Sequence, residues 1–237
     1  MGQRLVALAP GAGLEVAFGV DADGPRLADL DAADLADVAC VIDFSVQAQA
    51  RATAAFCAAR RLPLVLGTTG LTADDQAAVG DVAAHSPVVQ AANFSVGVTA
   101  LLDLVAEAAR LLSGFDPELV EAHHRHKVDA PSGTALALAE RVAAARGWAL
   151  PEVARHGRHG LVGARAGAEL GIHAVRGGSV VGEHRVLFLG DGEEVVLEHR
   201  ALDRDIFARG ALRAAAWAAT PGRPPGRYGM GDVLRTP

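Results

Sequence analysis

The stretch Glu121-Ala-His-His-Arg-His-Lys-Val-Asp-Ala-Pro-Ser-Gly-Thr-Ala135 gathers polar side chains in a chain whose other segments are rich in valine, leucine and alanine. Histidines and a lysine come first, and Pro131 then precedes a predicted helix that begins at Ser132. Serine is a favourable N-cap, and the N–H groups of Gly133 and Thr134 at a helix start predict an anion site. The stretch therefore predicts a strand that leads into the N-terminus of a helix.

Side chains alternate along an extended strand, so an extended segment from Glu121 to Lys127 would place His123, Arg125 and Lys127 on one face. That face would carry an imidazole, which titrates near neutral pH, and an ammonium group. A proton donor, a cation and a carboxylate cradle in one place predict an enzyme that acts on a small acid.

The histidine cluster has two other interpretations. Metal binding is one, but His123 and His124 are adjacent and point apart, and no Cys, Asp or Glu completes a site at the usual spacing. A solvated polar face is the other. Acid–base catalysis with carboxylate binding is favoured because the cluster lies beside a capped helix start, so we expect no metal. Arg176 is either a further cation for this site or an exposed residue at a strand end.

Length and composition narrow the class of protein. With 237 residues, 51% of them hydrophobic, the chain can form one large domain or two small ones. A net charge of −6 gives no indication of a nucleic-acid surface. No signal peptide and no apolar run of about 18 residues is present, so we expect no membrane partner. Cys40 and Cys57 are expected to be buried free thiols, which indicates a cytoplasmic protein.

Strands and helices alternate over the first 93 residues. We expect a helix at 3–9, a strand at 14–20 ending at Asp21, a strand at 38–44, a helix at 47–61, a strand at 63–67, a helix from Thr72 to about 84, and a strand at 87–91. This alternation predicts βαβ crossovers and a doubly wound, Rossmann-like sheet.

The pattern changes after Asn93. We expect helices at 98–112, 132–146 and 205–219, a mobile loop at 148–167, and strands at 169–175, 183–189 and 193–202. The Asp191-Gly192 pair between the last two strands is a strong hairpin signal. The region from 94 to 204 is therefore predicted to be an α+β domain with an open mixed sheet, mainly antiparallel.

Three short motifs follow predicted strands of the first part. Gly67-Thr-Thr-Gly70 is either a tight turn or a place where a ligand approaches the backbone at a strand end. Asp21 is either a solvated turn residue or the acid that binds the ribose of a dinucleotide. Asn93, before Phe94 and Ser95, either hydrogen-bonds a ligand or caps the next helix.

Taken together, these motifs resemble the dihydrodipicolinate reductase (4-hydroxy-tetrahydrodipicolinate reductase) family across nearly the whole chain. The matching segments are Val41-Ile-Asp-Phe-Ser45, Leu66-Gly-Thr-Thr-Gly70, Asn93-Phe-Ser-Val-Gly97, Glu121–Ala135, His173-Ala-Val-Arg-Gly-Gly178, Gly182-Glu-His184 and Leu202-Asp-Arg204. They occur in the family's order, and the block from Glu121 to Ala135 is highly specific.

The resemblance implies that NADH or NADPH reduces 4-hydroxy-tetrahydrodipicolinate to tetrahydrodipicolinate, with loss of water, in diaminopimelate and lysine biosynthesis. It implies that His123 is an acid/base residue, that Lys127 is a proton donor, and that His124 contacts the substrate. It further implies a substrate carboxylate on Gly133 and Thr134, and a cofactor site of Asp21, Gly67, Thr68, Thr69, Ala91, Ala92, Asn93 and Phe94.

The resemblance also implies a domain division and an assembly. Residues 1–93 with 205–237 would form the nucleotide-binding domain, and residues 94–204 the substrate-binding and tetramerisation domain. We expect a homotetramer, because an exposed antiparallel sheet invites association.

The N-terminus departs from the family's pattern. Met1-Gly2 aligns with the end of a glycine-rich turn, so the first strand and most of that turn are absent from the nucleotide domain. Either the true start lies upstream, or the chain is a degenerate, non-catalytic dicarboxylate-binding or assembly protein. Since no basic residue follows Asp21 to hold a 2′-phosphate, we expect NADH to be slightly favoured.

Overall fold

The computed structural model describes residues 1–21, 27–30 and 35–235. The chain divides into two compact units, Met1–Val96 with Asp205–Pro237, and Gly97–Arg204. Each unit has its own sheet and its own buried core. No helix in the described part of the chain has both the length and the apolarity needed to cross a bilayer.

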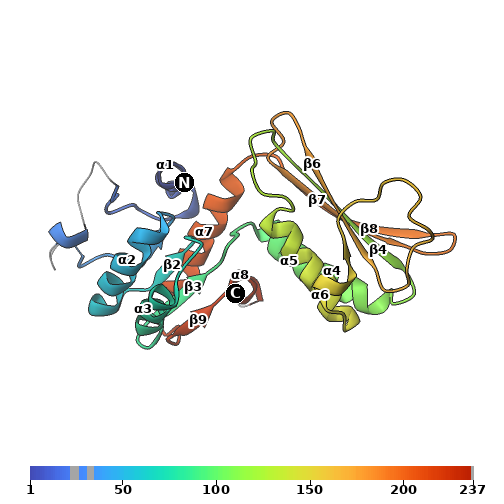
Figure 1. Cartoon of the computed structure of the whole chain (residues 1–237). Helices are drawn as coiled ribbons and strands as arrows, with labels where there is room; N and C mark the ends of the chain where they lie inside the picture. The colour runs from blue at the N-terminus through green and yellow to red at the C-terminus, as the bar shows by residue number, and fades with distance from the viewer. Residues whose placement is uncertain (22–26, 31–34, 236–237) are drawn as a thin grey trace. The chain divides into compact units, whose positions relative to one another are not determined.

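Unit 1 is built on a parallel sheet with helices on both faces (Figure 1). Its strands, in the spatial order β1-β2-β3-β9, are β1 (Val41–Asp43), β2 (Leu64–Leu66), β3 (Pro87–Gln90) and β9 (Gly226–Tyr228). Its helices are α1 (Gly2–Leu8), α2 (Gln47–Arg60), α3 (Ala73–Ala83), α7 (Asp205–Ala218) and α8 (Met230–Arg235), with short 3-10 turns at Pro10–Ala12 and Leu27–Asp29.

Alternation along the strands assigns the two faces of this sheet. Val65 and Val89 are fully buried among residues of α1, α7 and α8, whereas Leu64, Leu66 and Val88 are buried among residues of α2 and α3. Strands covered on both faces need the continuous apolar runs that the sequence has. The predicted doubly wound class is confirmed.

The predicted strand at 14–20 is wrong, because the segment forms no regular structure. Its alternating apolar residues Val16, Phe18 and Val20 are 39%, 39% and 45% exposed. An apolar alternation becomes a strand only where a neighbouring strand accepts its backbone hydrogen bonds. Among the residues described, no strand pairs with this segment.

Unit 2 contains a mixed five-stranded sheet in the order β5-β6-β4-β7-β8. The strands are β4 (Asp116–His123), β5 (Ala154–Arg155), β6 (Leu170–Arg176), β7 (Gly182–Leu189) and β8 (Glu194–Ala201). Strand β4 pairs in parallel with β6 and antiparallel with β7, and β7 forms the expected hairpin with β8. The predicted open mixed sheet is confirmed.

Helices cover one face of this sheet. Leu101 and Val105 of α4 (Val96–Leu111) and Leu138 and Val142 of α5 (Gly133–Arg146) pack in one core with Leu119 of β4. A third, short helix, α6 (Leu150–Val153), adds to the same core. Because β4 alternates, its inward residues lie against these helices and its outward residues lie on the opposite face.

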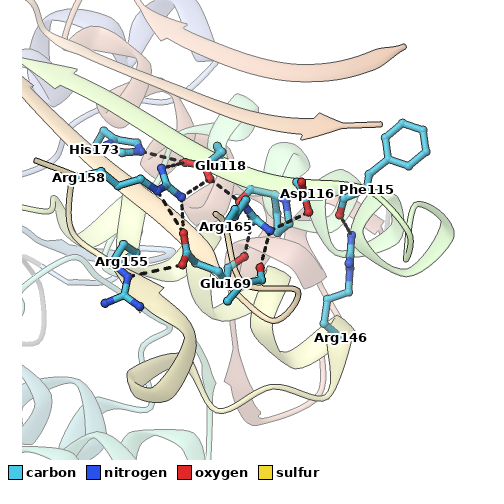
Figure 2. A network of polar contacts seen from close by, with 11 residues as sticks. Phe115, Asp116, Glu118, Arg146, Arg155, Arg158, Arg165, Glu169 and His173 are labelled. Atoms are coloured by element: carbon cyan, nitrogen blue, oxygen red, sulfur yellow. Dashed lines mark hydrogen bonds and ion pairs between the residues drawn. The ribbon is translucent and has the colours of Figure 1, made fainter. Parts of the chain in front are cut away.

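The segment expected to be a mobile loop, 148–167, contains α6 and β5, and ion pairs tie the rest of it to the sheet (Figure 2). Glu118 of β4 accepts hydrogen bonds from Arg158 and Arg165 of this segment, and His173 Nε2 lies 2.9 Å from the same carboxylate. Burial alone would raise the pKa of Glu118, but these partners outweigh it and lower the pKa to about 2.

A glycine on β6 makes room for this carboxylate. A Cβ at Gly171 would lie only 1.8 Å from Glu118 Oε2, so no other residue fits opposite Glu118 without movement. The sequence pattern of the loop, rich in Gly, Arg and His, indicates polarity but does not indicate that its arginines find partners on a strand about 40 residues earlier.

Arg146 of α5 caps the C-terminal end of α4. Its guanidinium donates hydrogen bonds to the carbonyl oxygens of Ala109, Leu112, Ser113 and Phe115, all between 2.6 and 3.0 Å. The last carbonyls of a helix have no partner within the helix, and the Arg146 guanidinium supplies charged donors to this group. The Leu112 carbonyl also accepts from the Phe115 N–H at 2.9 Å.

We expect Arg146→Ala to destabilise unit 2 by about 2 kcal/mol, since partly buried carbonyls would lose their charged donor. Native-state hydrogen exchange of amides in α4 and α5 measures the change. Arg141→Ala is the matched control, because Arg141 lies exposed on the same helix. Equal protection in the two variants would contradict this role for Arg146.

Candidate active site

A fully buried carboxylate, Glu121, lies at the centre of the polar stretch. Strand β4 points Glu121 inward, and its exposed fraction is 0%. Its Oε1 accepts from the Ser132 N–H at 3.0 Å and from Arg176 Nη2 at 2.7 Å. Its Oε2 accepts from Arg176 Nη1 at 2.8 Å and lies 2.6 Å from His123 Nδ1. Three segments of unit 2 therefore meet at one side chain.

This carboxylate is charged despite its burial. Burial alone would raise the pKa of Glu121, but hydrogen bonds from Arg176, His123 and the Ser132 N–H outweigh that effect and lower the pKa below its usual value. The same pairing raises the pKa of Arg176. Of the two alternatives for Arg176, the structure favours a cation within this cluster, where its guanidinium is paired with Glu121, over an exposed strand-end residue.

His123 is held by its neighbours on both sides. Its Nδ1 faces Glu121, and its ring meets the ring of His184 edge-on, with 5.2 Å between centroids. A Cβ at Gly182 would lie 3.1 Å from His123 Nε2, so a glycine at that position leaves room beside this nitrogen. The Nδ1 side is occupied and the Nε2 side is open to a small group.

The predicted shared face of His123, Arg125 and Lys127 is not formed. Strand β4 ends at His123, and residues 125 and 126 form a turn in which the Lys127 N–H donates to the His124 carbonyl at 3.1 Å. Lys127 Nζ instead lies 2.8 Å from Asp129 Oδ1 and lowers the pKa of that carboxyl. Alternation stops where a turn hydrogen bond replaces the strand ladder.

The start of α5 has the predicted cap. The Ser132 hydroxyl accepts from the Ala135 N–H at 3.1 Å, so Ser132 is the N-cap and Gly133 and Thr134 form the first turn. The N–H groups of a first turn point out of the helix toward any anion placed there. His184 Nε2 lies 3.0 Å from the Ser132 hydroxyl, which links the cap to β7.

His124 points to a different side of the turn from His123. Its Nε2 lies 3.3 Å from Arg204 Nη2, and its ring is 6.2 Å from that of His126. Together with Gly178 and Ser179, these residues line a small hollow. Burial first, and then the positive charge of Arg204, lower the pKa of His124, which favours a neutral ring.

Seven of the eight candidate cofactor residues in unit 1 lie at the carboxyl ends of neighbouring parallel strands. Gly67, Thr68 and Thr69 follow β2, and Ala91, Ala92, Asn93 and Phe94 follow β3. Parallel strands end at the same edge of a sheet, so the two turns are neighbours. The Asn93 side chain accepts from the Ser95 N–H at 2.8 Å, an Asx-turn directly before α4.

Close contacts hold these two turns in place. The Thr68 hydroxyl donates to Asp43 Oδ1 at 3.0 Å, and the Gly67 N–H donates to the Asp43 carbonyl at 2.8 Å. A Cβ at Gly210 of α7 would lie 1.7 Å from the Phe94 carbonyl oxygen. Only a glycine allows the helix to approach the second turn this closely.

Asp21, the eighth candidate, is exposed and follows the irregular segment 14–20 rather than a strand. Residues 22–26, which come directly after it, lie outside the described part of the chain. Asp21 therefore does not follow a strand in the described chain, and its role in binding a ribose stays a prediction.

Sequence reasoning missed the importance of Glu121 and His184. Glu121 is an acid on the inward side of an otherwise apolar strand, two residues before His123, and that pattern was the available signal. His184 is 4% exposed, and burial lowers its pKa to about 4, so it is neutral near pH 7. Its partner Ser132 lies 52 residues away in the sequence, which no local pattern reveals.

One chain that contains a Rossmann-like unit and a mixed-sheet unit with a buried histidine–carboxylate pair has the composition of a two-unit α/β enzyme. Two family models match this chain, Dihydrodipicolinate reductase, N-terminus, over residues 1–94, and Dihydrodipicolinate reductase, C-terminus, over residues 97–234. The chain belongs to the dihydrodipicolinate reductase family, whose members use a nicotinamide cofactor.

Relatives named 4-hydroxy-tetrahydrodipicolinate reductase are similar over most of the chain. The protein of Ruegeria pomeroyi is 48% identical over 92% of this chain and 81% of its own length. That of Myxococcus xanthus is 52% identical over 86% and 74%. A solved structure of dipicolinate-bound dihydrodipicolinate reductase from Paenisporosarcina sp. TG-14 covers 98% of this chain and 95% of its own, with a TM-score of 0.75 and 23% identity, and confirms the fold.

Proposed function

We propose that this chain uses NADH or NADPH to reduce 4-hydroxy-tetrahydrodipicolinate to tetrahydrodipicolinate, a step of diaminopimelate and lysine biosynthesis. The observation that supports this most is the placement of His123, on a buried carboxylate, in the same unit as a capped helix start. Relatives that are about half identical carry the name of this reaction. No observation favours the non-catalytic alternative.

In the proposed mechanism, His123 and Lys127 transfer protons, and the start of α5 binds the substrate. The N–H groups of Gly133 and Thr134 bind one substrate carboxylate, and His124 contacts the substrate from the other side of the turn. His123 holds a proton on Nδ1 against Glu121 and exchanges protons at Nε2. Through Nε2, His123 passes the ring proton lost in dehydration to the departing hydroxyl, which leaves as water. The Lys127 ammonium stabilises the negative charge that hydride addition places on the ring and then donates the proton that neutralises it.

A nicotinamide cofactor fits the edge of the parallel sheet in unit 1. The turns after β2 and β3 carry small residues, and Thr69 and Ala92 are exposed there. Asp43 Oδ2 is buried at the same edge with no partner in the described part of the chain, which leaves an acceptor for a ligand hydroxyl or amide. When bound, the cofactor supplies the hydride. We propose that residues 1–93 and 205–237 bind it, and that residues 94–204 bind the substrate.

We further propose a cytoplasmic homotetramer. The face of the unit 2 sheet opposite α4 and α5 carries partly exposed apolar side chains, including Val120, Val175 and Leu187. A second sheet packed on that face would bury them. Cys40 and Cys57 are free, and burial raises the pKa of each thiol to about 12, which suits a reducing compartment.

Purified protein given NADH and 4-hydroxy-tetrahydrodipicolinate should oxidise NADH. Lys127→Ala should lower kcat on the order of 100-fold, because a proton donor is removed, while NADH binds as before. Loss of NADH absorbance measures turnover, and NADH fluorescence measures binding. Arg125→Ala in the same turn is the control and should keep parental turnover.

Equal losses of turnover and NADH binding in Lys127→Ala would make Lys127 a structural residue. Failure of the parent chain to bind NADH up to millimolar concentrations would contradict the proposed activity.

We expect calorimetry to show tighter binding of NADH than of NADPH. A carboxylate at Asp21 can accept from the 2′-hydroxyl of NADH and would repel the 2′-phosphate of NADPH. Asp21→Ala should narrow the difference between the two cofactors. Equal or tighter binding of NADPH by the parent chain would contradict this preference.

A further inference from the structure

We propose that Glu121 is a positioning residue that holds the His123 imidazole with its proton on Nδ1 and holds the first turn of α5 in register with that ring. The proposal rests on the proposed function for the roles of His123 and α5. It assigns a task to a side chain that touches neither substrate nor cofactor in the proposed mechanism.

The first step is the state of the carboxylate. Glu121 is 0% exposed and forms two hydrogen bonds with the Arg176 guanidinium, at 2.7 and 2.8 Å. Arg176 is held in turn by the carbonyl oxygens of Val175 and Asp129, at 2.8 and 2.7 Å. A buried carboxylate with a bidentate arginine is ionised, so both of its oxygens only accept hydrogen bonds.

The second step is the proton on His123. An ionised carboxylate oxygen 2.6 Å from Nδ1 requires that Nδ1 be the donor. A neutral His123 ring therefore carries its hydrogen on Nδ1 and presents a lone pair at Nε2. Gly182 leaves space on that side, since a side-chain carbon there would come within 3.1 Å of Nε2.

The third step is the link to the carboxylate cradle. The oxygen of Glu121 that does not face His123 accepts from the Ser132 N–H at 3.0 Å, and Ser132 is the N-cap of α5. His184 joins the same arrangement, with its Nε2 near the Ser132 hydroxyl and its ring against His123. The Glu121 side chain therefore sets the distance between the His123 ring and the anion site at the start of α5. Catalysis is sensitive to such distances between reacting groups.

If Glu121 were purely structural, its substitution would lower the stability of the fold but would not change the tautomer of His123. Glu118 on the same strand provides the comparison. Its side chain is 13% exposed and also has arginine and histidine partners, but by alternation it points to the opposite face from His123.

The test uses the full chain, its Glu121→Gln variant and the Glu118→Gln control. A long-range proton–nitrogen-15 correlation spectrum reports which nitrogen of His123 carries the hydrogen while the ring is neutral. We expect hydrogen on Nδ1 in the parent chain and in Glu118→Gln, and a shift toward hydrogen on Nε2 in Glu121→Gln. Hydrogen on Nε2 in the parent chain would overturn the proposal, even if the variant does not fold.

Kinetics provide the second readout. We expect Glu121→Gln to lower kcat on the order of 100-fold with unchanged NADH affinity, and Glu118→Gln to keep the parental kcat at a temperature where it is folded. Parental kcat in folded Glu121→Gln would overturn the proposal. An inactive parent chain with the expected tautomers would contradict the proposed function instead and support the positioning of His123 by Glu121.

Discussion

A buried negative charge must find enough partners within the fold, and in unit 2 that requirement falls on Glu121. Transfer of an unpaired carboxylate into the interior costs several kcal/mol, so the strands and the helix around it can pack only where their donors meet it. Arg176 comes from β6, Ser132 from the start of α5, and His123 from β4 itself. The groups that compensate this one charge therefore also fix His123 and the start of α5 within the candidate active site.

The two acids of β4 show how one strand serves both faces of a sheet. Glu121 points inward and fixes the helix start, whereas Glu118 points outward and ties down the segment that carries Arg158 and Arg165 (Figure 2). In each case arginines distant in the sequence hold the carboxylate ionised. In unit 1 the corresponding constraint is steric, since Gly210 must lack a side chain for α7 to reach the turn at Phe94.

Much of the fold could be predicted from the sequence, because helices and buried strands have local periodicity and local caps. Thr72 and Ser132 cap helices as expected, and the Asp191-Gly192 turn joins β7 to β8. The segment 14–20 has the pattern of a strand but finds no partner in the described chain, and pairing is a property of the whole sheet. Likewise, the local pattern of the polar stretch did not reveal that the strand ends at His123 and that a turn follows it.

The location of the candidate site could be predicted from the sequence, but the contacts between its side chains could not. The polar stretch and the capped helix marked the place, and the family resemblance supplied roles for His123, Lys127 and His124. The pairing of Glu121 with Arg176, and of Ser132 with His184, joins residues more than 50 positions apart, so only the folded chain reveals it.

A crystal structure of the chain with dipicolinate tests the arrangement most directly. The account predicts one carboxylate of the ligand on the N–H groups of Gly133 and Thr134, and a polar atom of the ligand within hydrogen-bond distance of His123 Nε2. A ligand that binds away from the start of α5, or that contacts His123 through Nδ1 with Glu121 displaced, would contradict it.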